Sequence, residues 1–131
     1  DTPEESLSQY LKRIKTGNGS VVLEFHFDAS GTGKGTGTTS IVGSDADRLD
    51  KACAKELVEA TSSILGVRNR GVISEGQSAR GRLGLMRKEG IVSLLEITFI
   101  DNIKDVELYH KNKKKLAKAV ADIVIKYEKM I

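Results

Sequence analysis

IVSLLEITFI (Ile91–Ile100) is a near-continuous apolar run that is rich in strand-forming residues. Such a run is typical of a central strand whose two faces are both covered, as in a sheet flanked by helices. Glu96 is the one charged residue within it. A carboxylate is costly to bury unless it is paired, protonated or functional. The stretch therefore predicts a buried strand and, within it, an acid that needs an explanation.

A second strand is predicted at Val21–Phe27, VVLEFHF, because β-branched and aromatic residues dominate it. Strand alternation places Glu24 and His26 on the same face as Val22, and places only apolar side chains on the other face. We expect the apolar face to pack on the core. His26 then lies near the carboxyl end of the strand, where open α/β sheets place their binding sites.

Amphipathic helices are predicted before, between and after these strands from apolar residues at helical spacing. Their ranges are 2–14, 44–66 and 113–130. Ser44 is the expected N-cap of the second helix, and Gly66 is expected to end it. The glycine-rich segments 28–43 and 67–90 are predicted to be loops. Helices that alternate with buried strands predict one α/β layered domain, with no linker and no second domain.

The composition is that of an ordinary globular domain, with 131 residues, 39% hydrophobic and 30% charged, and a formal net charge of +3. Aromatic residues make up only 5% and do not alternate with basic ones, so nucleic-acid binding is not expected. The single cysteine excludes an internal disulfide. No run predicts a membrane span, and the start does not resemble a signal peptide, so synthesis in the cytoplasm is expected.

The loop after the first strand, GTGKGTGTTS (residues 31–40), has the composition of a phosphate-binding loop but not its spacing. Lys34 follows Gly33, yet Asp28 stands where the first glycine of such a loop belongs, and Gly35 stands where serine or threonine belongs. A dinucleotide fingerprint fails too, because the glycines recur at every second residue. Two readings remain, a flexible surface loop and a loop that flanks a cleft and lets a long substrate approach.

His26 and Glu96 each allow a structural and a functional interpretation. A histidine on a strand is often only a hydrogen-bonded residue, but it is also a common metal ligand. For Glu96 the structural interpretation is a salt bridge, with Arg70, Arg82 or Arg87 as partner. The functional one is a general acid or base whose pKa is raised by a pocket.

Short segments of this chain resemble, in order and spacing, the zinc-dependent N-acetylmuramoyl-L-alanine amidases found in many phage and prophage endolysins. The segments are VLEFHFDAS, GKGTGT, NRGV, LGLMRK and SLLEITFIDNIKD. Two patterns are fairly specific when they occur together, H-[FL]-[ND]-A-S and L-[VL]-E-x-x-F-[IC]-x-N. The resemblance extends over essentially the whole chain and implies a twisted, mostly parallel sheet flanked by helices.

By position, the resemblance implies that His26 is the last zinc ligand and that Glu96 is the catalytic glutamate. The implied reaction is hydrolysis of the amide between the lactyl group of muramic acid and L-alanine in peptidoglycan. Zinc activates water for such a reaction, and a nearby carboxylate moves the proton. The implied cofactor is Zn²⁺, and the implied place of action is the bacterial cell wall, with no membrane partner.

The chain departs from the family pattern in two local positions and in one larger respect. Asp28 stands where asparagine is usual, and Thr98 lies near a common glycine. The family's first zinc histidine and its glutamate ligand are expected before residue 1, so 1–131 is expected to be the C-terminal part of a catalytic domain. His110 lies on a lysine-rich surface, and Glu24 lies about 7 Å from His26 along the strand, so neither is expected to replace them.

Other functions remain open at this point. The piece alone is expected to bind zinc weakly and to be inactive, since one histidine does not make a zinc site. A catalytically incomplete or non-enzymatic cell-wall-binding remnant is therefore the alternative, and a zinc carboxypeptidase-like enzyme is a third reading. Absent initial strands would leave a sheet edge exposed, which predicts pairing with a missing N-terminal segment or with a second copy.

Overall fold

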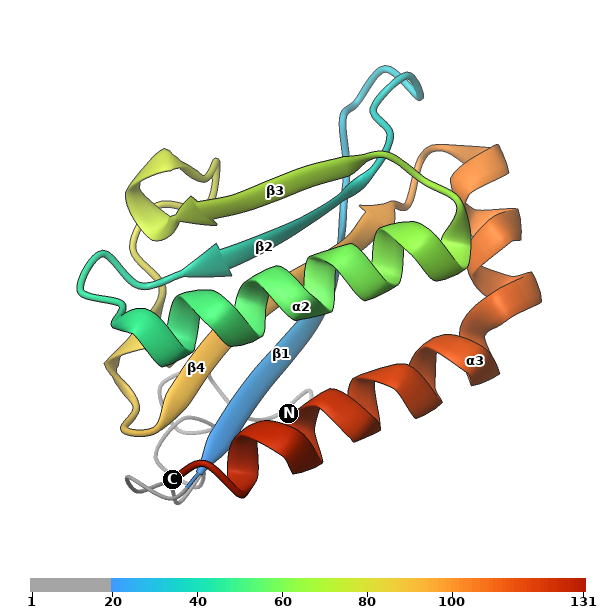
Figure 1. The fold of residues 1–131 in the computed structure, drawn as a ribbon. Coiled ribbons are helices and arrows are strands. Elements are labelled where there is room, and N and C mark those ends of the chain that lie inside the picture. The colour runs from blue at the N-terminus through green and yellow to red at the C-terminus, as the bar shows by residue number, and fades with distance from the viewer. Residues whose placement is uncertain (1–19) are drawn as a thin grey trace, which may run out of the picture.

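The computed structural model describes residues 20–131 and shows one sheet with two long helices (Figure 1). The helix predicted at 2–14 lies outside the described residues. In chain order the elements are β1 (Val21–Asp28), β2 (Thr38–Val42), α2 (Arg48–Leu65), β3 (Asn69–Ser74), the 3₁₀ turns η1 (Glu75–Gln77) and η2 (Gly84–Arg87), β4 (Ile91–Phe99) and α3 (Ile103–Glu128).

The four strands form one mostly parallel sheet in the order β1-β4-β2-β3. β1 pairs with β4 in parallel, and β2 pairs with β3 in parallel, whereas β2 and β4 run antiparallel. The long connections after β2 and before β4 carry the chain across the sheet. This topology confirms the predicted α/β fold with a mostly parallel sheet flanked by helices.

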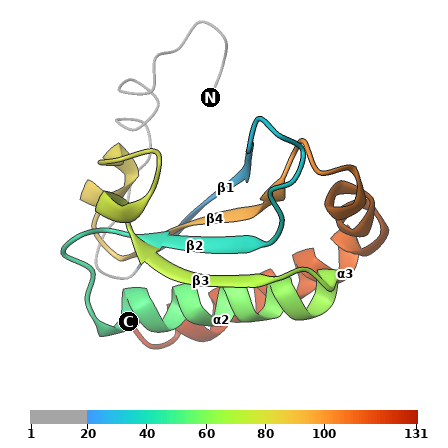
Figure 2. The same ribbon diagram turned by 90° about the horizontal axis from the view of Figure 1, so that it is seen from above.

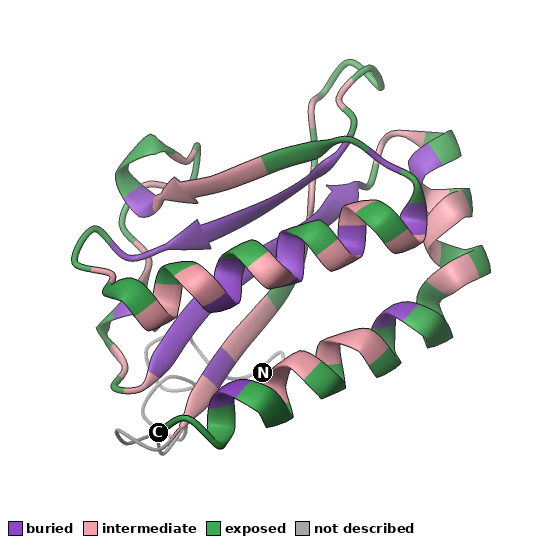
Figure 3. Ribbon diagram, in the orientation of Figure 1, coloured by how far each residue is buried: buried purple, intermediate pink, exposed green. Residues whose placement is uncertain are grey.

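β4 forms the centre of the molecule, as its sequence predicts, and every residue of Ile91–Phe99 is buried (Figure 3). Leu95 and Ile97 pack with residues of α2 and α3 on one face of the sheet. Val92 and Leu94 pack on the other face, against Leu85 and Met86 of η2. Figure 2 shows the two long helices on one side of the sheet and the 3₁₀ turns on the other.

Caps stabilise the ends of α2, and a side-chain hydrogen bond joins α3 to α2. Asp47, rather than the predicted Ser44, caps α2, and it forms a reciprocal capping box with Asp50. Gly66 ends α2 as predicted, in the left-handed conformation with φ 72°. Near the end of α3 the Tyr127 hydroxyl donates to Glu56 of α2. Neither helix in the described part of the chain has an apolar stretch that could cross a bilayer.

Two strands lie where loops were predicted, and these predictions were wrong. β2 lies inside 28–43, and β3 lies inside 67–90. β2 is fully buried although Thr38, Thr39 and Ser40 are polar. The Thr38 hydroxyl donates to the Glu96 carbonyl at 3.0 Å, and the Ser40 hydroxyl donates to the Ala54 carbonyl at 2.8 Å. Hydrogen bonds to backbone carbonyls of other elements therefore take the place of apolar side chains, so the sequence of β2 does not look like that of a buried strand.

β1 lies at the edge of the described sheet, and its apolar face is only partly covered. Val21, Leu23 and Phe27 pack against the core as predicted. Phe25 remains 48% exposed. It lines an apolar groove of about 370 Å³ between β1 and α3, together with Leu95, Ile97, Tyr109, Lys113, Leu116, Ala117, Val120 and Ala121. The apolar face of β1 therefore leaves a hydrophobic surface open beside α3.

Candidate functional site

The site lies on the face of the sheet that is turned away from the two helices. His26 on β1 is the register partner of Glu96 on β4, and Glu96 is in turn the partner of Thr39 on β2. Cross-strand partners point to the same face of a sheet. Three polar side chains therefore form a row across the middle of the sheet, and the predicted pair His26 and Glu96 lies on adjacent strands.

Glu96 is a buried acid that pairs with Arg80 and lies beside Asp28. Its residue exposure is 6%, and Oε1 accepts a hydrogen bond from Nε of Arg80 at 3.1 Å. Oε2 receives no hydrogen bond from any residue in 20–131. Burial, followed by a side-chain hydrogen bond with the Asp28 carboxyl, raises the pKa of Glu96, and Arg80 opposes this rise. A carboxylate with a raised pKa accepts a proton more readily than an ordinary carboxylate.

The partner of Glu96 is not one of the three arginines that the sequence suggested. Arg87 pairs with the buried Glu75, Arg70 lies 5.0 Å from the centre of the Phe99 ring, and Arg82 is exposed. Arg80 occupies the position because the segment after η1 folds back over the sheet. This stretch contains several arginines and glycines, and their spacing does not distinguish Arg80 as the partner of Glu96.

His26 has an exposed side-chain fraction of 34%, and its Nε2 contacts Oε1 of Glu24. The two residues share a face of β1, as alternation predicts. Their Cα atoms lie two residues apart on the strand, but the long glutamate side chain bridges the separation. His26 is therefore already held by a carboxylate, a contact that the sequence reasoning did not expect.

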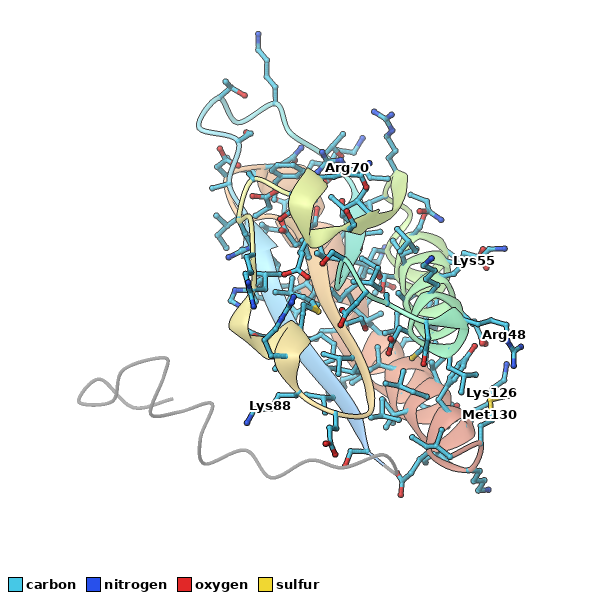
Figure 4. The ribbon with its side chains drawn as sticks, turned by 90° about the vertical axis from the view of Figure 1, so that its left-hand side faces the viewer. Arg48, Lys55, Arg70, Lys88, Lys126 and Met130 are labelled. Carbon is cyan, nitrogen blue, oxygen red and sulfur yellow. The ribbon has the colours of Figure 1, made fainter. Side chains whose placement is uncertain are left out.

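Glu96 and Thr39 line a cavity of about 540 Å³. Its other lining residues are Phe27, Asp28, Ala29, Arg70, Ile73, Gln77, Ser78, Ala79 and Arg80. The cavity therefore has an apolar side, two carboxylates and two guanidinium groups. Figure 4 places Arg70 beside the segment that follows β3, whereas Arg48 and Lys55 lie on the helical side of the molecule. His26 does not line this cavity but lies next to it, across the strand pair.

The glycine loop is held beside the site by two carboxylates that follow β4. Asp101 accepts hydrogen bonds from the backbone N–H groups of Ser30, Gly31 and Gly33. Asp105 accepts from the backbone of Gly37 at 3.0 Å and from the hydroxyls of Thr36 and Thr98. These bonds keep the pKa of each carboxyl below its usual range. These bonds fasten the loop to the residues that follow β4, although no residue of 30–37 lines the cavity.

The described residues do not provide a complete zinc site. Within residues 20–131 no group of three histidine, cysteine, aspartate or glutamate side chains is placed to hold a metal ion. Zinc sites in proteins use three or four protein ligands. His26 supplies one imidazole, and its contact with Glu24 orients that ring. His110 is exposed on α3 beside Tyr109, away from this face.

Residues 1–126 match the N-acetylmuramoyl-L-alanine amidase family. No curated protein matches the sequence. Among solved structures, the chain is similar to an N-acetylmuramoyl-L-alanine amidase from Clostridium difficile 630, with TM-score 0.68 and 20% identity over 82% of this chain and 57% of that one.

A putative N-acetylmuramoyl-L-alanine amidase from Neisseria meningitidis is also similar, with TM-score 0.67 and 24% identity over 79% of this chain and 56% of that one. The catalytic domain of the CD27L endolysin, which targets Clostridia difficile, has TM-score 0.64 and 19% identity over 82% of this chain and 54% of that one. The chain thus spans little more than half the length of these structures.

Proposed function

Because the chain belongs to the N-acetylmuramoyl-L-alanine amidase family, we propose that it is part of an enzyme that hydrolyses peptidoglycan between muramic acid and L-alanine. The observation that carries this proposal is the placement of Glu96, which is buried, lines a cavity and lies beside His26 on the neighbouring strand. The substrate is a glycan-peptide, and the place of action is the bacterial cell wall.

In this proposal Glu96 moves the proton. It takes a proton from the attacking water, whose oxygen forms a bond to the carbonyl carbon of the amide. The carbon–nitrogen bond breaks, and Glu96 delivers the proton to the departing amine of L-alanine. The burial that raises the pKa of Glu96 makes it basic enough for the first transfer and acidic enough for the second.

His26 is proposed as one ligand of a zinc ion whose remaining ligands lie outside the described residues. A zinc ion would polarise the amide carbonyl and lower the pKa of water. The contact between Glu24 and the His26 ring supports this assignment, since a carboxylate partner fixes the orientation of a ligating imidazole. Part of the protein outside residues 20–131 is proposed to cover the exposed edge of β1.

Metal content tests the assignment of His26. The full-length protein is purified and its zinc is measured by mass spectrometry, together with His26→Ala and the control His110→Ala. We expect about one zinc per chain in the wild type and in the control, because a catalytic site holds one ion. The His26→Ala protein is expected to lose most of it. Full zinc occupancy in His26→Ala would remove His26 from the site.

The absence of a three-ligand group in residues 20–131 favours one alternative, a catalytically incomplete piece that retains only wall binding. The two functions differ in their response to Glu96→Gln. The variant keeps the shape of the side chain but accepts no proton. Loss of wall hydrolysis with unchanged wall binding supports the enzyme, whereas wall binding without hydrolysis in the wild type supports the alternative.

A further inference from the structure

Thr39 carries a buried hydroxyl without a hydrogen-bond partner among residues 20–131. Its exposure is 6%, and its Oγ1 has no hydrogen-bond partner in the described part of the chain. Its neighbours Thr38 and Ser40 both donate to backbone carbonyls. A buried hydroxyl that is left unpaired costs about 1–3 kcal/mol. The position is therefore expected to have a function other than completing the hydrogen bonds of β2.

A second unpaired atom lies next to Thr39. Thr39 and Glu96 are register partners on the antiparallel pair of β2 and β4, and both side chains line the same cavity. Cβ atoms of such partners are about 4.5–5.5 Å apart. Oε2 of Glu96 also has no partner among residues 20–131. A threonine hydroxyl donates and accepts, whereas a carboxylate only accepts.

A water molecule placed between Thr39 and Glu96 would give both atoms a partner. It donates one hydrogen to Oε2 of Glu96 and accepts the hydrogen of the Thr39 hydroxyl. This arrangement leaves its second hydrogen and its second lone pair directed into the cavity. The Asp28 carboxyl shares a side-chain hydrogen bond with Glu96, but Oγ1 of Thr39 has no hydrogen-bond partner within residues 20–131. The geometry thus selects a small ligand that both donates and accepts hydrogen bonds.

We propose that Thr39 is a catalytic residue that holds the attacking water against Glu96 during amide hydrolysis, an inference that rests on the proposed function. When the water oxygen bonds to the carbonyl carbon, Glu96 receives the proton and later passes it to the leaving amine. The Thr39 hydroxyl is unchanged at the end of the cycle. Its contribution is orientation, because it fixes the lone pair that attacks.

The kinetic test uses variants that separate the hydroxyl from the shape of the side chain. Thr39→Val removes the hydroxyl at nearly the same volume, and Thr39→Ser retains it. In the full-length protein we expect Thr39→Val to lower kcat about 10–100-fold with little change in KM, and Thr39→Ser to restore most of the rate. An unchanged kcat in Thr39→Val, or an equal loss in both variants, would overturn the proposal.

Ser93 provides the matched control. Its Oγ is also buried and unpaired within residues 20–131, but Ser93 does not line the cavity. Ser93→Ala is therefore expected to leave kcat unchanged. A loss in Ser93→Ala equal to that in Thr39→Val would show that both losses come from a disturbed fold, and would overturn the catalytic role.

A structural experiment tests the role of Thr39 without measuring enzyme activity. Crystal structures of the wild-type protein and of Thr39→Val are compared at about 1.5 Å resolution. We expect an ordered water within hydrogen-bond distance of both Thr39 Oγ1 and Glu96 Oε2 in the wild type, and its loss in the variant. A Thr39 hydroxyl bonded elsewhere in the protein would overturn the proposal. A wild type that holds this water but hydrolyses no muramoyl-L-alanine amide would instead overturn the proposed function.

Discussion

Glu96 combines two properties that are seldom found together, since its side chain can carry a charge and it lies in a fully buried strand. Arg80 compensates only one of its oxygens. The raised pKa shows that the fold disfavours the ionised form. Such an arrangement costs stability and is typical of a residue that is kept for its chemistry.

The first prediction concerns the stability of Glu96→Gln. A carboxyl with a raised pKa contributes most to stability below its ordinary pKa of about 4.5, and this contribution is lost as the pH rises through the folded value. The variant should therefore melt at the same temperature as the wild type or higher at pH 7. Thermal melts at pH 4 and pH 7 measure this. A lower melting temperature at pH 7 would show that the charged form supports the fold.

Glu75 is a buried acid with the opposite electrostatics. Its carboxylate accepts hydrogen bonds from the backbone of Ser44 at 2.8 Å and of Leu83 at 2.9 Å, and it pairs with Arg87. These partners outweigh burial and lower the pKa of Glu75 to about 2. Glu75 therefore connects the segment before α2 to the two 3₁₀ turns.

The second prediction is that Glu75→Gln destabilises the protein by about 2–3 kcal/mol at pH 7, because Arg87 loses its partner. A depressed pKa contributes stability above the ordinary value of 4.5 and loses it as the pH falls toward about 2. The difference from the wild type should shrink over this range. Urea denaturation measures it, with the exposed Glu59→Gln as control, and a difference independent of pH would contradict the assignment.

At the scale of elements, the sequence predicts β1, β4 and α2 correctly, because apolar residues mark each of them, and it therefore places His26 on β1 and Glu96 on β4. It does not reveal β2, whose buried residues Thr38, Thr39 and Ser40 depend on hydrogen bonds rather than on apolar character. The sequence does not reveal the pairing of Glu96 with Arg80 either, because this pair depends on how the segment after η1 folds back over the sheet.

The third prediction concerns the glycine loop, where it enters β2. Gly37 has φ +103°, and a Cβ added there would lie 2.6 Å from the Arg68 carbonyl oxygen. Gly31 also has a positive φ, +76°, but an added Cβ would meet nothing within 4 Å. Gly37→Ala should destabilise the protein by about 2–4 kcal/mol, and Gly31→Ala by about 1 kcal/mol. If denaturant titrations gave equal losses of unfolding free energy for the two variants, the close contact with the Arg68 carbonyl at Gly37 would be unimportant for stability.

At the scale of the whole molecule, the sheet formed by residues 20–131 has β1 at its edge and an apolar groove beside it. A strand edge with an adjacent apolar surface tends to associate. The solved structures that resemble this chain are longer, and the chain covers 54–57% of the three compared here. The chain is therefore similar to about half of each of these structures.

The fourth prediction is that the 131-residue chain expressed alone self-associates through this surface. Phe25 is 48% exposed in the groove, so Phe25→Lys should shift the molecule toward the monomer. Sedimentation velocity at several concentrations measures the change, with the exposed Ile103→Lys as a control on an apolar residue that does not line the groove. A monomeric wild-type chain would show that this edge does not drive association.

The most direct test of the account is the identity of the bond that is cut. Purified peptidoglycan is treated with the full-length protein and with Glu96→Gln, and the new chain ends are identified by mass spectrometry. We predict new α-amino groups on L-alanine and free lactyl carboxylates on muramic acid with the wild type, and neither with the variant. Release of single terminal amino acids, or equal cleavage by Glu96→Gln, would contradict the account.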